Sequence, residues 1–190
     1  MEVPRWFEID VSRETLDKLL NFSALLEKWT RSINLIAKST VNEIFERHIW
    51  DSAQTFQPFS SKWADLGSGG GLPGVVIAIL AQAQHLSGEV VLIESVQRKA
   101  TFLRTCARQL DVPITVIAKR IEEAEAQGAQ IVSARALSSL PRLLELSTPH
   151  LSPGGMAVFQ KGSQWKSEIS EAQKTWRFSY EALPSKTDKN

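Results

Sequence analysis

The sequence predicts an α/β fold in which a mostly parallel, twisted sheet carries helices on both faces and follows a helical extension. Short stretches rich in Val and Ile alternate with stretches of helical periodicity in the later part of the chain, a pattern typical of parallel strands joined by helices. A loop made almost entirely of glycine follows the first of these strands. We therefore expect a helical extension over residues 1–58 and one compact α/β unit over residues 59–190.

Size and composition limit the possible classes. The chain has 190 residues, 43% of them hydrophobic, which suits one domain with a substantial core. Lys and Arg number 22 and Asp and Glu 21, so the formal net charge is +1 and any surface for nucleic acid must be a local patch. A single cysteine, Cys106, excludes an internal disulfide. His48, His85 and His150 are far apart in sequence, and we expect no metal site.

The N-terminus and the hydropathy pattern bear on localisation. Residues 1–6 contain the acidic Glu2 and are interrupted by Pro4, which is unlike a signal or transit peptide. No apolar stretch approaches the length needed to span a bilayer. We expect a cytoplasmic protein that has no membrane partner and is a monomer.

The extension shows two helix starts. Ser12 followed by Glu14 predicts the first, and apolar residues from Leu16 onward then recur at spacings of three or four, so one face of this helix is buried. Thr40 and Glu43 have the spacing of a capping box and predict the second. A Pro-Phe-Ser-Ser loop over residues 58–61 then precedes the first strand.

The glycine loop joins a strand over residues 63–66 to a helix over residues 75–81, with Pro73 in the first turn of that helix. Glycines lack a Cβ atom, so they can adopt positive φ and expose bare backbone to a ligand, and the helix start adds unpaired N–H groups. This arrangement predicts a cofactor cradle that includes Gly67 and Gly69.

Two classes of cofactor match the cradle. The spacing Gly69-x-Gly71-x-x-Gly74 fits the dinucleotide fingerprint. The spacing Asp65-x-Gly67-x-Gly69-x-Gly71 resembles the first motif of S-adenosylmethionine (SAM) methyltransferases. Asp65 favours SAM, because a carboxylate beside the first glycine repels a pyrophosphate and suits the cationic amino acid end of SAM.

Further elements place candidate residues at one edge of the sheet, because parallel α/β sheets bind ligands beyond the carboxyl ends of their strands. Glu94 ends the second strand, twenty-seven residues after Gly67, near the spacing expected for an acid that binds ribose hydroxyls. Arg120, Arg135 and Lys161 follow the third, fourth and fifth strands. The later strands are expected at residues 88–94, 114–117, 131–134 and 155–160, and the helices at residues 96–110 and 140–147.

Several motifs together indicate a family. They are Asp-Leu-Gly-Ser-Gly-Gly-Gly-Leu-Pro-Gly at residues 65–74, Arg-Ile-Glu-Glu at 120–123, Ser-Ala-Arg-Ala at 133–136, Ile-Asn-Leu at 33–35, Arg-His-Ile-x-Asp-Ser at 47–52 and Lys-Gly at 161–162. With them, the chain resembles the ribosomal RNA small subunit methyltransferase G family, also called glucose-inhibited division protein B, over nearly its whole length.

The resemblance implies a class I, Rossmann-like SAM-dependent methyltransferase that forms 7-methylguanosine in the 530 loop (conventional position 527) of 16S rRNA. Its partner would be the 30S subunit or an assembly intermediate. Motif by motif, the resemblance and the cradle imply a set of cofactor contacts: Gly67, Gly69 and Leu72 in the loop, Glu94 at the ribose, Ile121 and Glu122 beside the adenine, and Arg135 beside the methyl donor. Asn34, Arg120 and Lys161 are the candidates for contact with RNA.

The chemistry of this reaction predicts no general base. Guanine N7 already has an available lone pair, so its attack on a methyl group requires no prior loss of a proton. The Asn-Pro-Pro-aromatic signature of exocyclic-amine methyltransferases is absent after the fourth strand, where Ser133 begins a different motif. We expect catalysis by alignment, with Arg135 as the residue nearest to a catalytic role.

Three departures from the family and three alternatives remain. Glu94 stands where an aspartate is common in the family. Leu137 occupies a position where the family has a bulkier or aromatic residue, and residues 180–188 look like the approach to one more strand, so the last strand is expected to be missing or the sheet to end in an exposed edge. The alternatives are a SAM-dependent methyltransferase of another RNA or small molecule, a nicotinamide-dependent oxidoreductase, and a non-catalytic RNA-binding assembly factor.

Overall fold

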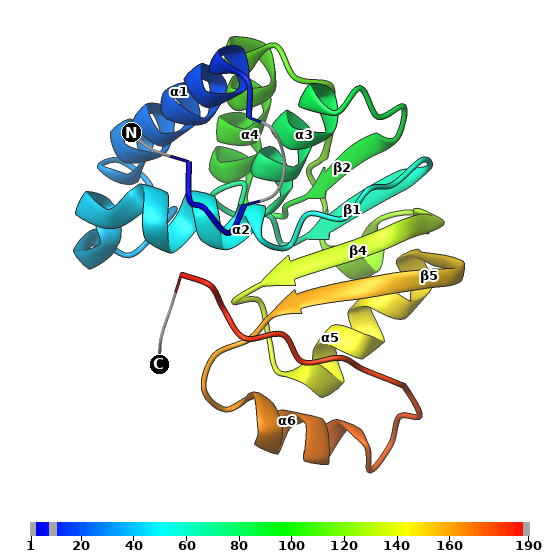
Figure 1. The fold of residues 1–190 in the computed structure, drawn as a ribbon. Coiled ribbons are helices and arrows are strands. Elements are labelled where there is room, and N and C mark those ends of the chain that lie inside the picture. The colour runs from blue at the N-terminus through cyan, green and yellow to red at the C-terminus, as the bar shows by residue number, and fades with distance from the viewer. Residues whose placement is uncertain (1–2, 8–10, 188–190) are drawn as a thin grey trace.

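The centre of the molecule is a five-stranded sheet with the strand order β3-β2-β1-β4-β5, in which all neighbouring strands are parallel (Figure 1). The computed structural model describes residues 3–7 and 11–187, so the predicted features at Met1, Glu2 and Asp188 lie outside the described residues. The predicted parallel sheet is confirmed. Its strands are β1 (Lys62–Leu66), β2 (Glu89–Ile93), β3 (Ile114–Ile117), β4 (Ala129–Arg135) and β5 (Leu151–Gln160).

Helices cover both faces of this sheet, as predicted. On one face, a hydrophobic cluster joins the sheet to α1, α3 and α4, and on the other a second cluster joins the sheet to α5. Side chains of β1 divide between the two clusters in alternation, since Trp63 belongs to the first and Ala64 to the second. The helices are α1 (Arg13–Thr30), α2 (Asp51–Ala53), α3 (Gly74–Ala83), α4 (Gln97–Leu110), α5 (Leu140–Ser147) and α6 (Trp165–Ala172).

The extension begins as the sequence predicts and then differs. Ser12 is the N-cap of α1, and its hydroxyl accepts a hydrogen bond from the Thr15 N–H at 3.2 Å. The predicted capping box at Thr40 is wrong. A 3₁₀-helix already begins at Lys38, so Thr40 lies inside it, and the Thr40 hydroxyl donates backward to the Ala37 carbonyl at 2.8 Å and lies 2.7 Å from His48 Nε2. A π-helix over Phe45–Trp50 then leads into α2.

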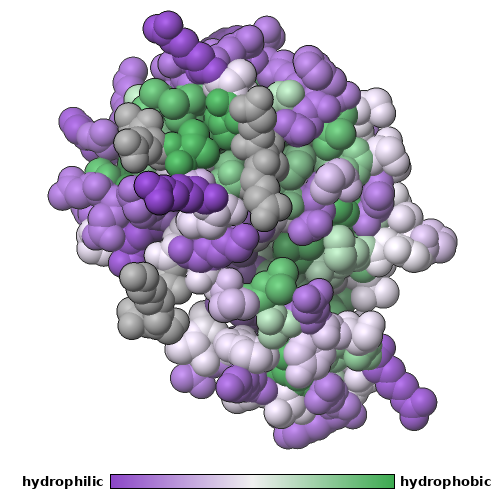
Figure 2. Space-filling view, in the orientation of Figure 1, coloured by the Kyte–Doolittle hydropathy of each residue, from purple (hydrophilic) through white to green (hydrophobic). Residues whose placement is uncertain are grey.

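The extension shares its core with the sheet. Phe22 of α1 and Trp50 of the π-helix are buried in the same cluster as Ile77 of α3, Trp63 of β1 and Phe102 of α4. One hydrophobic cluster therefore contains side chains from both sides of residue 58. In the same orientation as Figure 1, hydrophobic side chains show through the middle of the face, and hydrophilic side chains cover most of its margin (Figure 2). Within the described residues, no helix has the length and apolar character to cross a membrane.

The final described segment returns from α6 toward α2 without forming a strand (Figure 1). β5 is the last strand in the sheet order, and Met156 on it is among the exposed large hydrophobic residues. Near the end of the segment, the hydroxyls of Ser185 and Thr187 hydrogen-bond to Asp51 of α2. Within residues 180–187, the structure thus shows an irregular segment where the sequence predicts the approach to a strand.

Candidate active site

The carboxyl ends of the strands meet along one edge of the sheet. Leu66 of β1 pairs with Ile93 of β2, which pairs with Ile117 of β3, and Arg135 of β4 pairs with Gln160 of β5. The prediction that residues after these strands lie along a common edge is confirmed. Ligands of parallel α/β sheets bind at such an edge.

The glycine loop at this edge is held by backbone hydrogen bonds. The Ser68 N–H donates to the Ile93 carbonyl at 3.1 Å, and the Ser68 hydroxyl donates to the Asp65 carbonyl at 2.9 Å. Gly67 has a φ of +64°, and a Cβ atom there would lie 2.6 Å from Leu137 Cδ1. The positive φ favours glycine at this position, and a larger residue would also displace the Leu137 side chain. Leu72, later in the loop, is buried.

Asp65 supports the loop from behind. Its side chain is 1% exposed, and its Oδ1 accepts a hydrogen bond from the Ser133 hydroxyl at 2.7 Å, which in turn accepts one from Trp63 Nε1 at 2.8 Å. Its Oδ2 has no hydrogen-bond partner within the described part of the chain. Burial raises the pKa of Asp65 to about 6, although the hydrogen bond from Ser133 opposes the shift.

The position of Asp65 corrects the argument made from the sequence. The sequence predicts a carboxylate beside the ligand, whereas the Asp65 side chain lies between β1 and α3. A Cβ atom on Gly74 would lie 2.8 Å from Asp65 Oδ2 and would also clash with Leu92, so glycine at this position allows α3 to approach the sheet closely. Asp65 therefore acts on the site through the loop and through helix packing.

Glu94 clamps the glycine loop to the end of β2. Its side chain is 6% exposed, its Oε2 accepts a hydrogen bond from the Gly69 N–H at 2.8 Å, and its Oε1 accepts one from the Val96 N–H at 2.7 Å. Each carboxylate oxygen has two lone pairs, so each can accept another hydrogen bond from a ligand hydroxyl. The predicted ribose contact is compatible with this geometry and stays a prediction.

A 3₁₀-helix over Ile121–Glu123 follows β3 and carries two of the predicted cofactor residues. Ile121 is buried in the cluster that contains Leu66 and Ile93 of the site edge. Glu122 is exposed and forms an ion pair with Arg142 of α5. Arg120, a candidate for RNA contact, is exposed at the start of this helix.

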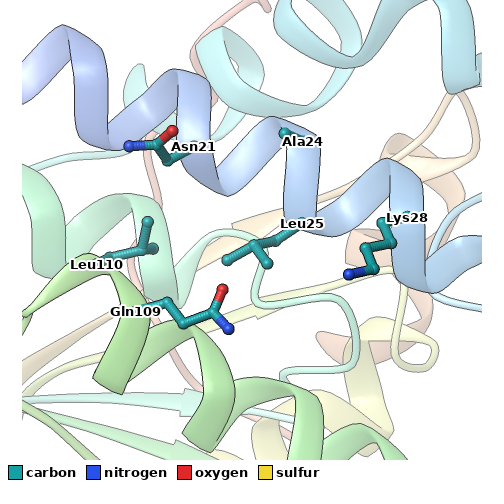
Figure 3. A pocket seen from close by; sticks show the side chains of 6 residues that line it. All are labelled: Asn21, Ala24, Leu25, Lys28, Gln109 and Leu110. Carbon is teal, nitrogen blue, oxygen red and sulfur yellow. The ribbon is translucent and has the colours of Figure 1, made fainter.

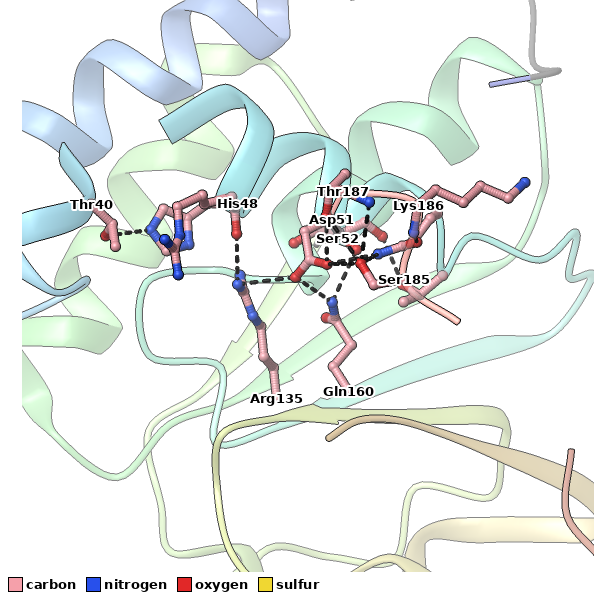
Figure 4. A network of polar contacts seen from close by, with 12 residues as sticks. Thr40, His48, Asp51, Ser52, Arg135, Gln160, Ser185, Lys186 and Thr187 are labelled. Carbon is pink, nitrogen blue, oxygen red and sulfur yellow. Dashed lines mark hydrogen bonds and ion pairs between the residues drawn. The ribbon is translucent and has the colours of Figure 1, made fainter. Parts of the chain in front are cut away.

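Arg135 contacts the helical extension (Figure 4). Its Nη2 donates to the Arg47 carbonyl at 2.8 Å and lies 3.0 Å from Asp51 Oδ2. Burial lowers the pKa of Arg135, Asp51 raises it and Arg47 lowers it, and the guanidinium stays charged. The predicted contact with the methyl donor is not tested by these neighbours.

The two remaining RNA candidates differ in their surroundings. The Lys161 ammonium is only partly exposed, because it forms an ion pair with Glu168 at 2.6 Å and donates to the Ser138 carbonyl at 2.8 Å. Asn34 is exposed in the loop after α1. The neighbouring Leu35 packs on the glycine loop, since a Cβ atom on Gly70 would lie 3.2 Å from the Leu35 carbonyl oxygen.

Sequence reasoning assigns no role to Asp51 or His48, although both belong to the motif at residues 47–52. Asp51 accepts hydrogen bonds from several segments of the chain (Figure 4). His48 is buried, and the pKa of its imidazole is lowered to about 4 by burial and by the nearby charges of Arg135 and Arg47. The motif at residues 47–52 was the available signal for these two residues. It did not reveal the partners Arg135, Gln160 and Thr187 of Asp51, because they are remote in sequence.

A pocket of about 230 Å³ lies between α1 and α4 (Figure 3). It is at the end of α4 that leads into β3, away from the carboxyl ends of the strands, so we do not assign the cofactor to it. Its lining residues are Asn21, Ala24, Leu25, Lys28, Gln109 and Leu110. Within residues 3–7 and 11–187, no group of three or more His, Cys, Asp or Glu side chains is arranged to hold a metal ion.

Comparison with known proteins identifies matches over almost the entire chain. The family model for rRNA small subunit methyltransferase G matches residues 15–189. A protein of Cereibacter sphaeroides named ribosomal RNA small subunit methyltransferase G is 50% identical over 184 residues, which cover 95% of this chain and 89% of that protein. A protein of the same name from Ruegeria pomeroyi is 44% identical over 190 residues, which cover 99% of this chain and 93% of that protein.

Solved structures show the same fold at low sequence identity. A tRNA (m1A58) methyltransferase from Aquifex aeolicus has a TM-score of 0.53 and 14% identity, covering 78% of this chain and 59% of that one. A precorrin-6Y C5,15-methyltransferase from Geobacter metallireducens has a TM-score of 0.50 and 13% identity, covering 75% of this chain and 73% of that one. The fold is therefore that of the class I SAM-dependent methyltransferases.

Proposed function

Because the chain belongs to the rRNA small subunit methyltransferase G family, we propose that it methylates N7 of a guanine in 16S rRNA with SAM as the methyl donor. The observation that carries this proposal is the glycine loop that Glu94 clamps at the carboxyl edge of the sheet, in a chain that the family model matches over residues 15–189. The substrate is the 16S rRNA of the 30S subunit or of an assembly intermediate.

The residues at this edge fit SAM. The backbone of Gly67, Gly69 and Leu72 would hold the amino acid end and the ribose side of the cofactor. Glu94 would accept hydrogen bonds from the ribose hydroxyls through its second lone pairs. Ile121 would supply apolar surface for the adenine and Glu122 a polar rim. Arg135, at the end of β4, would lie beside the methyl donor. When bound, SAM supplies a methyl group on a positively charged sulfur.

The chain's own contribution to the reaction is alignment. Guanine N7 presents a lone pair, so no side chain has to remove a proton before attack. The buried titratable groups near the site are poor bases for such a step. Asp65 accepts a hydrogen bond from Ser133, Glu94 accepts hydrogen bonds from the Gly69 and Val96 N–H groups, and the pKa of His48 is lowered to about 4. Well-aligned reacting groups can lower a barrier by roughly 7–11 kcal/mol without any acid or base.

RNA contact is proposed for a few side chains around the site. Asn34 and Arg120 are exposed, so both side chains are accessible to RNA. Lys161 is engaged with Glu168 and Ser138, so it would act on RNA through the loop after β4, which it holds in place. Because the net charge is +1, phosphate contacts from such a local patch should make RNA binding fall steeply with salt.

Methyl transfer from labelled SAM tests the proposal. The acceptors are naked 16S rRNA and 30S subunits that lack the modification, and mass spectrometry identifies the modified nucleotide. We expect a single 7-methylguanosine in the 530 loop. A thermal shift with SAM but not with NAD is the accompanying result. No incorporation into either acceptor, or incorporation at another nucleotide, would overturn the proposal.

Two glutamates at opposite ends of β2 provide a matched pair of variants. Glu94→Ala removes the hydrogen bond that holds Gly69 and the proposed contacts with the ribose hydroxyls. We expect SAM affinity to fall by about 10- to 100-fold, the range for loss of a hydrogen bond to a charged group. Glu89→Ala changes an exposed carboxylate at the start of the same strand, where it pairs with Lys62. SAM affinity should be unchanged in Glu89→Ala, and equal losses in the two variants would contradict the site assignment.

A further inference from the structure

The carboxylate of Asp51 accepts hydrogen bonds or ion-pair contacts from four segments of the chain (Figure 4). Its Oδ2 lies 3.0 Å from Arg135 Nη2 at the end of β4 and accepts a hydrogen bond at 2.8 Å from Gln160 Nε2 at the end of β5. Its Oδ1 accepts from Gln54 Nε2 at 2.7 Å and from the Thr187 hydroxyl at 3.1 Å. The oxygen that faces the sheet thus differs from the one that faces the end of the chain.

We propose that Asp51 is a positioning residue for methyl transfer, because it fixes the guanidinium of Arg135 at the edge of the sheet where the cofactor binds. The inference rests on the proposed function, which places Arg135 beside the methyl donor. It assigns the helical extension a task in the reaction, namely to supply the anion that orients Arg135.

The register of the sheet places Arg135 beside the glycine loop. Ser133 of β4 pairs with Asp65 of β1, so Arg135, which ends β4, and Gly67, which directly follows β1, are each two residues beyond this pair at the carboxyl edge. After Arg135 the chain turns sharply, with Ala136 at a φ of +49°, and Leu137 then contacts Gly67. Leu137, two residues after Arg135, thus brings the end of β4 against the loop that is proposed to hold the cofactor.

The contacts of Arg135 leave it able to bind a ligand. Both contacts to the extension, to the Arg47 carbonyl and to Asp51, are made by Nη2. A guanidinium has five N–H donors in a fixed planar arrangement. Holding one end of this plane determines where the remaining donors point.

The burial of the Arg135–Asp51 ion pair indicates that the pair orients Arg135 more than it stabilises the fold. The Arg135 and Asp51 side chains are 20% and 17% exposed. The cost of removing such charges from water offsets much of their attraction, so a pair of this kind adds little net stability, whereas loss of one partner leaves the other uncompensated. Gln160 supports the geometry by donating both to the Asp51 carboxylate and to the Asp51 carbonyl at 2.9 Å.

A double-mutant cycle tests the proposal on the full chain. The variants are Asp51→Asn, Arg135→Ala and the combination, and the measurements are kcat/KM for SAM in methyl transfer to 30S subunits, SAM affinity by calorimetry, and Tm. Asp51→Asn preserves the shape of the side chain and removes its charge. Thr187→Val is the matched control, because it removes a donor to Oδ1 and leaves the contacts of Oδ2 intact.

We expect Asp51→Asn to lower kcat/KM for SAM by about 10- to 100-fold, the range for loss of a charged hydrogen bond, and to have no further effect when Arg135 is already alanine. Asp51→Glu, which retains the charge, should preserve more activity than Asp51→Asn when both are assayed well below their Tm values, and Thr187→Val should match the wild type. Losses that add to those of Arg135→Ala, equal losses in Asp51→Asn and Asp51→Glu, or full activity of Asp51→Asn would overturn the proposal.

The failure of this inference can be told apart from failure of the proposed function. If the wild-type chain transfers no methyl group to either RNA acceptor, the function is wrong. If the wild type is active and the Asp51 and Arg135 effects are additive, the function stands and the positioning role is wrong.

Discussion

At the scale of single residues, the buried carboxyl of Asp65 makes stability depend on pH. Burial raises its pKa from 3.8 to about 6, so the folded chain holds this proton more tightly than the unfolded chain. Between about pH 4 and pH 6 unfolding therefore releases a proton, and the free energy of unfolding falls as pH rises, by about 3 kcal/mol across the window. Above about pH 6 Asp65 is ionised in both states, so its effect on the free energy of unfolding no longer changes with pH.

Asp65→Asn should remove this dependence while keeping an oxygen that accepts from Ser133. We expect the free energy of unfolding of the variant, relative to the wild type, to increase by about 3 kcal/mol between about pH 4 and pH 6.5. Urea unfolding at a series of pH values measures the difference. Parallel pH profiles of the two proteins would show that Asp65 does not titrate in this range.

His48 provides a control, because its contribution to the free energy of unfolding changes with pH in the opposite direction to that of Asp65. Its pKa falls from 6.5 to about 4, so the folded chain binds this proton less tightly, and the contribution of His48 to stability rises as pH increases from about 4 to about 6.5. In His48→Gln the free energy of unfolding, relative to the wild type, should therefore decrease over the same window. The two groups oppose each other in the wild-type chain, which makes single variants necessary to reveal either.

Gly67 has a natural comparison in Gly128, because both have positive φ, +64° and +57°. A Cβ atom at Gly67 would meet Leu137, whereas nothing lies within 4 Å of one at Gly128. Gly128→Ala should lower the free energy of unfolding by about 1 kcal/mol, the cost of the backbone conformation, and leave SAM affinity unchanged. Gly67→Ala should cost at least as much, because the Leu137 side chain must also shift, and should lower SAM affinity in calorimetry. Retention of wild-type affinity in Gly67→Ala would contradict the cradle.

Sequence patterns brought out residues whose surroundings are local. The glycine spacing and the acid at the end of the second strand singled out Gly69 and Glu94, which the structure joins by a hydrogen bond, while their cofactor contacts stay predictions. Sequence reasoning failed for Asp51, because its partner Gln160 lies 109 residues away in the chain. No local pattern reports such a contact, and the motif at residues 47–52 indicated importance without indicating geometry.

At the scale of elements, α6 supplies the cap that α5 lacks. Ser139, the N-cap residue of α5, makes no side-chain capping bond. Instead Glu168 of α6 accepts a hydrogen bond from the Leu140 N–H at 2.6 Å and pairs with Lys161. A carboxylate at a helix N-terminus also interacts favourably with the helix dipole. α6 thereby fixes both α5 and the loop after β4.

Glu168→Ala should lower the free energy of unfolding by about 1.5–3 kcal/mol, the range for a hydrogen bond to a charged group. Hydrogen exchange at the Leu140 amide should also accelerate. Glu171→Ala on the same helix removes an exposed pair with Lys174 and should change stability by about 0.5 kcal/mol or less. Equal stability of the two variants in urea unfolding would show that the cap contributes nothing.

Elements with a clear period were predictable, and those built by tertiary contacts were not. The strands and the helices α3, α4 and α5 lie where the alternation of apolar stretches predicts them. The 3₁₀-helix at Lys38–Glu43 and the π-helix at Phe45–Trp50 replaced an expected regular helix. Here the hydrogen bond between Thr40 and His48 outweighs the local capping preference.

At the scale of the whole molecule, the shared core predicts one cooperative unfolding transition. Phe22 of the extension is fully buried in the cluster that covers one face of the sheet. Phe22→Ala should therefore cost about 3–5 kcal/mol and destabilise the sheet as well as α1. Leu20→Ala, at an exposed position of the same helix, should cost about 0.5 kcal/mol or less.

Hydrogen exchange distinguishes the two possible behaviours. If the molecule unfolds as one unit, Phe22→Ala lowers the protection of amides in β1 and β4 as much as that in α1. If residues 1–58 unfold separately, α1 loses protection while the sheet keeps its wild-type protection. The second result would contradict a common core for the extension and the sheet.

The overall fold was predictable because it follows from general rules for alternating strands and helices. The parallel pairing of the strands and their common edge came out as expected, whereas the strand order β3-β2-β1-β4-β5 was not predicted from the sequence. What the sequence did not contain was the docking of the extension onto the ends of β4 and β5, which depends on a few polar contacts such as that of Asp51 with Arg135.

A crystal structure with S-adenosylhomocysteine is the most direct test of the central claim that the glycine loop and Glu94 form the cofactor site. We predict that the ligand lies on the backbone of Gly67 and Gly69, with its ribose hydroxyls within hydrogen-bond distance of the Glu94 carboxylate. A ligand bound in the pocket between α1 and α4, or a glycine loop that stays vacant at saturating concentration, would contradict the account.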